Sequence, residues 1–570
     1  MRFVEQLGRN TMFAYLWFGI HWIGWLVGNL FRRLRRLPDY VVLTLEGDYP
    51  ELPPKGGNFI LRKIRPPKIS LFEMREDFQR LQRDPRVRGV VIHLHSLDMP
   101  LARVSVLRRM LLDLRAHGKR VVVWSHGYNT SMYYLASAAD QVLLLPGGYF
   151  MPMGLTQNYV FLADALEAMG MKADFVQISP YKTAADSLMR REMSDEAREM
   201  ANWLADSSFH EVVTAIAEGR GMTEEQARRL IDQTPCTDLQ ALEMGLVDAL
   251  VEEEKLPEFL GEEGKPARLV TWEMVRSRVF RLPPRRPGKY LALISIEGSI
   301  VDGHNQEPPV KPPFPLPFLE RRAGDLSVVQ TVRQILADKR AVGVVVYVDS
   351  PGGSATAAEK MRTALAQLAA AKPLYIVMGP LAASGGYWVS TPAHKIFAQP
   401  TTLTGSIGVL SGKVVTGGLF EKLRIHRQSV NRGEHVRMYS GDDLFTEEER
   451  RKVWETIRHI YDLFLERVSH SRKMTPEDVD AIGGGRVWTG WQALENGLVD
   501  ELGGLEEALR QLREETGLPS TAPVRLFTPG KRPLAPTAAP ASALSYAWGG
   551  VRHLNGRVLC LCPWLELPAF

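Results

Sequence analysis

The chain has 570 residues, of which 45% are hydrophobic and 24% charged, a composition typical of a folded protein long enough for two or more domains. Its net charge of +5 is small for this length and argues against a nucleic-acid-binding protein, which needs clustered basic surface. The three cysteines are too few for a disulfide framework, and Cys560 and Cys562 alone cannot supply the four ligands of a structural zinc site.

Residues 12–31 form an apolar run near the N-terminus, interrupted by His21 and Asn29. As a helix this run would be roughly 30 Å long, the thickness of a bilayer core. The run is rich in aromatic residues and is followed by four arginines: Arg32, Arg33, Arg35 and Arg36. Both features suit a helix that spans a membrane and a helix that lies in its interface. We predict that residues 1–38 form a membrane anchor of one of these two kinds, and a buried soluble helix is the remaining interpretation.

The rest of the chain contains an internal repeat with an offset of 251 to 254 residues. Matching segments occur in the same order in both halves: 41–47 with 292–298, 89–96 with 343–350, and 241–248 with 493–500. Ordered landmarks at a nearly constant offset indicate a duplicated structural unit. We predict a first repeat at 39–282, a linker at Pro283–Gly288 and a second repeat at 289–520.

Short β-branched runs alternate with helical stretches inside each repeat. In the second repeat we predict strands at 344–348 and 374–378 and helices at 355–371 and 381–390. This alternation predicts right-handed βαβ units, a largely parallel sheet and therefore an α/β fold.

Three segments fall outside this pattern. The proline-rich segment 308–317 is expected to be a surface excursion. The segment 521–543 is rich in proline and alanine and is expected to be an extended tether. The apolar tail that completes 521–570 could dock on the body or touch a membrane, and the sequence leaves both open.

Thr130 in the first repeat and Ser384 in the second occupy the same position, so only the second repeat has a serine there. Ser384 follows a predicted strand and opens a predicted helix, whose N-terminus favours developing negative charge. In the simpler interpretation, Ser384 only caps that helix.

Glycines follow the predicted strand at 344–348, which precedes the Ser384 segment in the chain. Backbone N–H groups of Gly352 or Gly353, together with that of Gly385, could form an oxyanion hole at adjacent strand ends. The simpler interpretation is a tight turn. The first repeat has Asp98 and Met99 at the corresponding place and lacks this half of the site.

A serine nucleophile needs a base, and Lys182 in the first repeat is the candidate. Its neighbours are apolar, and its counterpart in the second repeat is Glu434. Burial would lower the pKa of a lysine from about 10.4, although an exposed lysine is the ordinary case. His394 would be the base of a serine–histidine site. Because each repeat keeps one of two complementary groups, the sequence predicts a hydrolase whose site spans both repeats.

Four short segments carry a resemblance to a known family: 181–184 (YKTA), 349–354 (DSPGGS), 382–387 (AASGGY) and 404–409 (TGSIGV). Over roughly residues 40 to 515 the chain resembles the long, tandem-repeat form of signal peptide peptidase A, a membrane-bound serine protease of the Clp/crotonase superfamily. The resemblance implies that Ser384 is the nucleophile, Lys182 the general base and Ser406 a hydroxyl that orients the lysine.

The resemblance also implies two tandem Clp/crotonase-like repeats, a homotetramer, no cofactor, no nucleic-acid partner, and apolar peptides such as cleaved signal peptides as substrates. It implies attachment to the bacterial inner membrane. Catalytic domains of relatives face the periplasm, whereas the arginines after the anchor favour the cytoplasm by the positive-inside rule, so the face stays open.

Two other functions fit parts of the sequence. Crotonase relatives also use paired amides as an oxyanion hole, so an acyl-CoA enzyme is one alternative. A repeat protein with one degenerate copy could instead be a non-catalytic membrane scaffold. Neither alternative requires both Ser384 and Lys182, and for that reason we favour the peptidase.

Overall fold

A computed structural model of the chain describes residues 2–53, 69–262, 264–285, 287–308, 320–530 and 556–562. Nearly all of the proline-rich segment 308–317, and most of the apolar tail, lie outside these residues.

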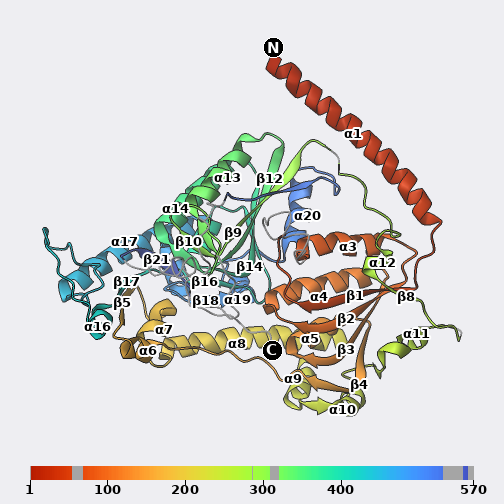
Figure 1. Cartoon of the computed structure of the whole chain (residues 1–570), viewed down its shortest axis with the longest axis horizontal. Helices are drawn as coiled ribbons and strands as arrows, with labels where there is room; N and C mark the ends of the chain where they lie inside the picture. Colours follow the sequence, from red (N-terminus) through yellow and green to blue (C-terminus); the bar gives the residue numbers. More distant parts are fainter. Residues whose placement is uncertain are drawn as a thin grey trace.

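Each repeat contains one large sheet, and the two sheets have the same strand order. The first sheet runs in the order β6-β4-β3-β2-β1-β8 and the second in the order β18-β16-β14-β12-β9-β20. The strands of the first sheet are β1 (Tyr40–Gly47), β2 (Gly89–Leu97), β3 (Arg120–Asn129), β4 (Gln141–Met151), β6 (Cys236–Thr237), β7 (Ala249–Leu250) and β8 (Leu269–Thr271). Those of the second are β9 (Tyr290–Glu297), β12 (Ala341–Ser350), β14 (Leu374–Ala383), β15 (Lys395–Ala398), β16 (Leu403–Gly405), β18 (Val487–Thr489), β19 (Glu501–Leu502) and β20 (Val524–Phe527). The predicted duplication and the α/β class are therefore present in the structure (Figure 1).

Helices follow the strands as the predicted βαβ order requires. In the first repeat they are α3 (Leu71–Arg83), α4 (Leu101–Ala116), α5 (Thr130–Ala136), α6 (Ala163–Ala168), α7 (Asp186–Met189), α8 (Asp195–Arg220), α9 (Glu224–Asp232), α10 (Asp238–Glu243), α11 (Leu256–Phe259) and α12 (Trp272–Val275). In the second they are α13 (Asp325–Ala337), α14 (Ala355–Ala371), α15 (Gly385–Ser390), α16 (Gly417–Lys422), α17 (Glu447–Arg472), α18 (Pro476–Ile482), α19 (Gly490–Glu495) and α20 (Leu505–Glu515).

The local sequence explains why β12 and α14 form where they do. The central part of β12, Val344–Val348, is buried throughout, which is typical of a parallel strand covered on both faces. Helix α14 begins where Ser354 Oγ accepts a hydrogen bond from the backbone N–H of Ala357 at 3.3 Å, and alanine then dominates its sequence.

A third sheet combines strands from distant parts of the chain. Its order is β11 (Arg322–Gly324), β10 (Ser299–Val301), β13 (Gly352–Ser354), β21 (Val558–Leu561), β17 (Leu410–Val415) and β5 (Lys172–Gln177). Strand β5 comes from the first repeat and β21 from the C-terminal tail, whereas the other four belong to the second repeat. This composite sheet joins the two repeats.

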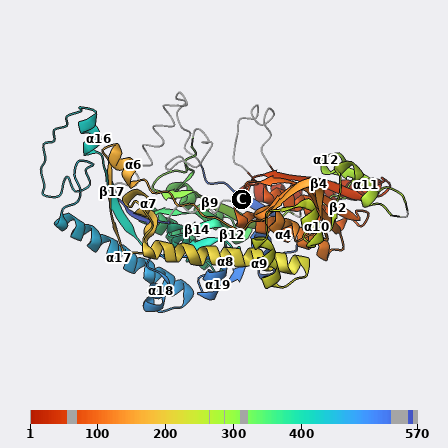
Figure 2. The same cartoon turned by 90° about the horizontal axis from the view of Figure 1, so that it is seen from below.

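Helix α8 makes a second connection between the repeats. In Figures 1 and 2 it runs from the neighbourhood of β5 and β17 to the first repeat, where α5 and α9 lie. Trp203 on α8 donates its indole N–H to the Val487 carbonyl at 2.8 Å and stacks on Trp488 with ring centres 4.8 Å apart. Contacts of this kind hold the first-repeat segment that follows β5 against the second repeat.

Helix α1 (Arg2–Arg33) lies outside the two repeats (Figure 1). Its C-terminal half contacts the body through Trp25, whose indole N–H donates to the Arg281 carbonyl at 2.7 Å, and Asn29, whose side chain also bonds Arg281. Within the described part of the chain, no helix combines the length and the hydropathy of a membrane-spanning segment.

Two predicted boundaries differ from the structure. The helix predicted at 381–390 begins only at Gly385, because Leu381–Ala383 continue β14 and pair with β16. Part of the expected tether forms β20, which pairs in parallel with β9 as β8 pairs with β1. Both differences come from strand pairing between distant segments.

Candidate active site

Ser384 sits at the turn between β14 and α15. Its side chain is fully buried, and its backbone N–H donates to the Gly405 carbonyl at 2.7 Å. The backbone has φ 56° and ψ −113°, a conformation that residues other than glycine rarely adopt. Strained backbone of this kind persists where the surroundings enforce it, and it is concentrated at functional sites.

Lys182 of the first repeat reaches this serine. Its Nζ donates to Ser384 Oγ at 2.7 Å, to the Ser406 carbonyl at 2.8 Å and to Ser406 Oγ at 2.9 Å. The lysine follows β5, and the antiparallel pairing of β5 with β17 carries it into the second repeat. The structure thus brings together the serine and the lysine that the sequence singled out in different repeats.

The electrostatic setting favours a neutral lysine. Lys182 is fully buried, and this burial lowers its pKa to about 8. A substantial fraction of the amine is therefore neutral at mildly alkaline pH, as a general base requires.

Ser406 holds the lysine in place. It is fully buried, has φ 50°, and donates its backbone N–H to the Arg486 carbonyl at 2.6 Å. Because both its carbonyl and its hydroxyl face Lys182 Nζ, Ser406 fixes the amine beside Ser384.

The three glycines named from the sequence meet next to Ser384. A Cβ at Gly385 would lie 3.1 Å from Gly352 Cα and 3.2 Å from the backbone nitrogen of Gly353. Gly352 has φ +99°, and its N–H donates to Ser350 Oγ at 3.2 Å. That hydrogen bond favours Gly353, rather than Gly352, as the amide that would act with Gly385 on an oxyanion.

The first repeat lacks the same arrangement. Thr130 lies at the start of α5, where its hydroxyl donates to the Gly154 carbonyl at 2.7 Å, and buried Met99 replaces the glycines. Glu434, the counterpart of Lys182, is largely exposed. The geometry provides one such site per chain in the described residues, built from both repeats.

His394 lies far from this site. Its Nδ1 accepts a hydrogen bond from the Leu374 N–H at 3.1 Å, at the beginning of β14, whereas Ser384 follows the end of that strand. At about 3.3 Å per residue, the length of β14 separates them by roughly 30 Å. The alternative in which His394 is the base is therefore wrong on geometry.

The sequence did not predict that the C-terminal tail enters the site. Strand β21 lies between β13 and β17, antiparallel to both. Burial raises the pKa of the Cys560 thiol to about 12 and that of the Cys562 thiol to about 11. The one available signal was the apolar character of residues 558–562, which left docking and membrane contact equally open.

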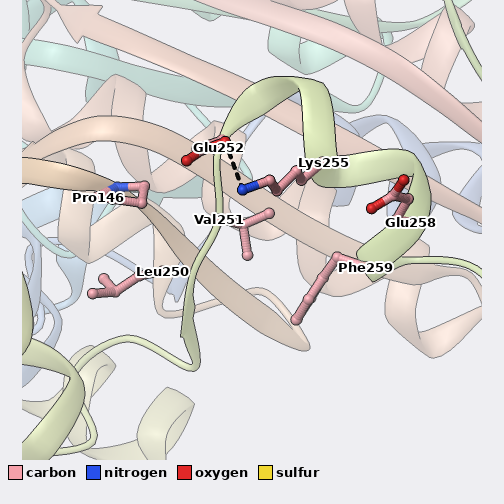
Figure 3. Close-up of a pocket in the computed structure, with 7 residues that line it drawn as sticks. All are labelled: Pro146, Leu250, Val251, Glu252, Lys255, Glu258 and Phe259. Carbon is pink, nitrogen blue, oxygen red and sulfur yellow. Dashed lines mark ion pairs between the residues drawn. The ribbon is translucent and has the colours of Figure 1, made fainter.

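A separate hollow of about 400 Å³ opens on the first repeat, between β4 and α11. Figure 3 shows its lining, including the ion pair of Lys255 with Glu252 at 2.9 Å. It shares no residue with the Ser384 site.

Comparison with known proteins identifies the family. Residues 113–264 and 366–519, one segment in each repeat, match the model of Peptidase family S49. The chain belongs to peptidase family S49.

Named relatives agree with this assignment. The chloroplastic serine protease SPPA of Arabidopsis thaliana is 29% identical over 80% of this chain and 67% of its own length. Protease 4 of Haemophilus influenzae is 29% identical over 79% of this chain and 73% of its own, and Protease 4 of Salmonella typhi 30% identical over 78% and 72%.

This S49 chain is therefore a serine protease, and the resemblance to the two-repeat form of signal peptide peptidase A is confirmed. The acyl-CoA enzyme and the non-catalytic scaffold are the alternatives that this assignment displaces.

Proposed function

We propose that this S49 protease is an endopeptidase that cuts extended apolar peptides with a Ser384–Lys182 dyad. The observation that carries the proposal is the 2.7 Å hydrogen bond between Lys182 Nζ and Ser384 Oγ in a fully buried setting. A lysine that is neutral and in contact with a serine hydroxyl can remove its proton.

The catalytic cycle follows from this contact. Ser384 Oγ attacks the peptide carbonyl carbon while its proton passes to Lys182 Nζ, and the Gly353 and Gly385 amides stabilise the oxyanion. Lys182 then protonates the leaving amine, which leaves an acyl-enzyme ester on Ser384. Water, deprotonated by Lys182, hydrolyses that ester and restores the serine. Ser406 keeps the amine aimed at Ser384 in each step.

The substrate class follows from the walls of the site. Apolar clusters flank the dyad on both sides, one containing Phe175, Ala185 and Leu410, the other Met200, Ala383 and Leu403. Strands β13 and β17 face each other across β21, which pairs with both, so their backbone can also pair with a substrate that binds as a strand. Apolar peptides such as cleaved signal peptides have this character.

We further propose that the enzyme works at a bacterial cell membrane, attached through α1, and as a homo-oligomer. Large apolar side chains of α1 are exposed, among them Leu16 at 64%, Ile23 at 60% and Phe31 at 64%. Such a row suits a helix embedded in a membrane or lying at its surface. The homotetramer follows from the family resemblance alone, and crosslinking in detergent would test it.

Hydrolysis of a fluorogenic apolar peptide tests the dyad. We expect Ser384→Ala and Lys182→Met each to lower kcat by at least about a thousandfold. We expect Ser406→Ala to lower it by about tenfold to a hundredfold, because it removes one of the two hydrogen bonds from the amine to Ser406. Ser125→Ala is the matched control, since Ser125 is a buried serine of the first repeat whose hydroxyl donates to the Leu94 carbonyl at 2.7 Å. Full activity in Lys182→Met would refute the dyad.

A further inference from the structure

The composite sheet contains a slot that is one strand wide. Strands β13 and β17 are not neighbours, because β21 lies between them and pairs with both. The register places Gly353 opposite Cys560 and Leu410 opposite Leu559. Since adjacent strands lie about 4.8 Å apart, the edges of β13 and β17 would bound an open slot roughly 10 Å wide without β21.

The backbone of β21 passes over the glycines of the candidate oxyanion hole. A Cβ at Gly352 would lie 2.0 Å from the Cys560 carbonyl oxygen and 2.7 Å from the Gly385 nitrogen. A Cβ at Gly385 would also lie 3.3 Å from that oxygen. The Cys560 carbonyl oxygen thus lies beside Gly352 and Gly385, and Cys560 pairs with Gly353, so all three glycines of the candidate oxyanion hole surround this part of β21.

Side chains of β21 alternate between the two apolar walls, as those of a bound strand must. Leu559 is 2% exposed and packs with Phe175, Ala185 and Leu410. Cys562 is 1% exposed and belongs to the cluster on the other wall.

Polar contacts hold both ends of the segment. Arg557 forms an ion pair with Asp302, and its carbonyl accepts from Ser411 Oγ at 2.9 Å. The Gly556 N–H donates to the Gly412 carbonyl at 3.1 Å, and the Cys562 N–H to the Pro351 carbonyl at 2.7 Å. With the strand in place Ser384 and Lys182 are both 0% exposed, so a second peptide has no access to them.

We propose that residues 556–562 are a tethered, self-inhibiting occupant of the substrate slot, bound in the register of a substrate with the Cys560 carbonyl at the oxyanion site. The proposal rests on the proposed function and extends it, because it defines the direction in which a substrate lies, antiparallel to β13 and β17. It also assigns a subsite. The substrate residue at the position of Leu559, one before the residue that bears the scissile carbonyl, faces the wall of Phe175 and Ala185.

Displacement of the strand is then a condition of activity. A substrate competes with a segment of the same chain, and covalent linkage makes that competition intramolecular, which favours the segment over a peptide in solution. Weakly binding peptides are excluded, and longer apolar peptides that fill both walls are admitted.

A binding experiment tests the occupant independently of catalysis. All chains carry Ser384→Ala, and the probe is a fluorescent peptide with the sequence of residues 556–562, followed by anisotropy under reducing conditions. We expect a chain that ends at Ala543 to bind the probe at least about tenfold more tightly than the full-length chain does.

A point variant covers the case in which the shortened chain folds poorly. In the full-length chain, Leu559→Asp places a charge against the apolar wall and should expel the strand, so probe binding should rise as in the shortened chain. Leu239→Asp is the matched control, since Leu239 is 68% exposed in the first repeat, and it should bind the probe as weakly as the parent.

Equal binding by the parent and by both tail variants would overturn the proposal. Failure of the proposed function has a different signature, since it appears as peptide hydrolysis that survives Ser384→Ala and Lys182→Met. With Ser384 intact, the shortened chain should also hydrolyse a short apolar peptide with a lower KM than the full-length enzyme, and the free probe should inhibit it competitively.

Discussion

At the scale of single residues, backbone strain marks the two serines that surround the Lys182 amine. Four non-glycine residues have positive φ in the described part of the chain. Lys473 and Arg424 follow helices, where left-handed residues are common. The other two are Ser384 and Ser406, and both contact Lys182 Nζ. A left-handed serine costs about 1 to 3 kcal/mol, so its appearance at both hydroxyls around one amine indicates that the fold is shaped to place them.

The pKa of Lys182 makes the activity dependent on pH. Burial lowers this pKa to about 8, and only the neutral amine can take the serine proton. At saturating substrate we expect kcat to rise with pH, to half its maximum near pH 8, and to fall about tenfold per unit well below that pH. We expect a bound substrate to bury the lysine as β21 does, so kcat, which reports the enzyme–substrate complex, is the constant to measure.

His394→Gln is the control for this profile, because the His394 ring bonds backbone at the far end of β14. Its profile should match that of the parent. A midpoint near the ordinary lysine value of about 10.4, or near about 6.5 for a histidine, would contradict Lys182 as the base.

Much of the residue-scale picture could be predicted from the sequence. Ser384 and Lys182 stood out because each was kept in one repeat and lost in the other, as Thr130 and Glu434 show. The hydrogen bond from Gly352 to Ser350 could not be predicted, because it depends on how the turn folds. That bond is the reason we favour Gly353 over Gly352 as an amide donor.

At the scale of elements, the lysine depends on a close approach of two loops. Gly485 precedes β18 and has φ +96°, and a Cβ there would lie 2.6 Å from both the nitrogen and the Cα of Lys182. We expect Gly485→Ala to push the lysine backbone and lower kcat/KM by about a hundredfold, as a displacement of about 1 Å does in other enzymes.

Gly433→Ala is the matched control for this change. Gly433 has φ +99°, but no atom lies within 4 Å of its added Cβ. Gly433→Ala should lose about 1 kcal/mol of stability through backbone strain, measured by thermal unfolding. Gly485→Ala should lose more, because its Cβ also meets the Lys182 backbone, and only Gly485→Ala should lose peptidase activity. Equal losses of activity would show that the approach to Lys182 does not position it.

The sequence predicted least well the strands that form by pairing with segments far away in the chain. The helix predicted at 355–371 has the same ends in the structure, because its alanine-rich composition is a local signal. The last residues of β14, the four residues of β20 and the whole of β21 became strands because β16, β9, β13 and β17 pair with them. No local pattern contains that information.

At the scale of the whole molecule, duplication explains why the site is shared. The two large sheets have the same order, yet β5 leaves the first repeat and joins a sheet of the second. Further links lie between the repeats, such as Arg103 of α4, which bonds Asp349 at 3.2 Å. Because one repeat holds the lysine and the other the serine, neither repeat contains both groups, and their counterparts Thr130 and Glu434 take no part in the Ser384–Lys182 contact.

The exposed apolar side chains of α1 lead us to predict that the whole protein binds a membrane through this helix. Arg33, Arg35 and Arg36 are exposed beyond its apolar stretch and should be drawn to anionic lipid. The full-length protein should co-sediment with phosphatidylglycerol vesicles, whereas a chain that begins at Leu37 should remain in the supernatant with its peptidase activity intact. In the full-length chain, the combined substitutions Leu16→Glu, Ile20→Glu and Ile23→Glu should also abolish sedimentation, because charge is costly in the apolar layer of a membrane. The same three changes at Leu239, Leu423 and Leu444, which are exposed on the body, should leave it unchanged. If the chain that begins at Leu37 still co-sediments with the vesicles, the attachment site lies outside α1.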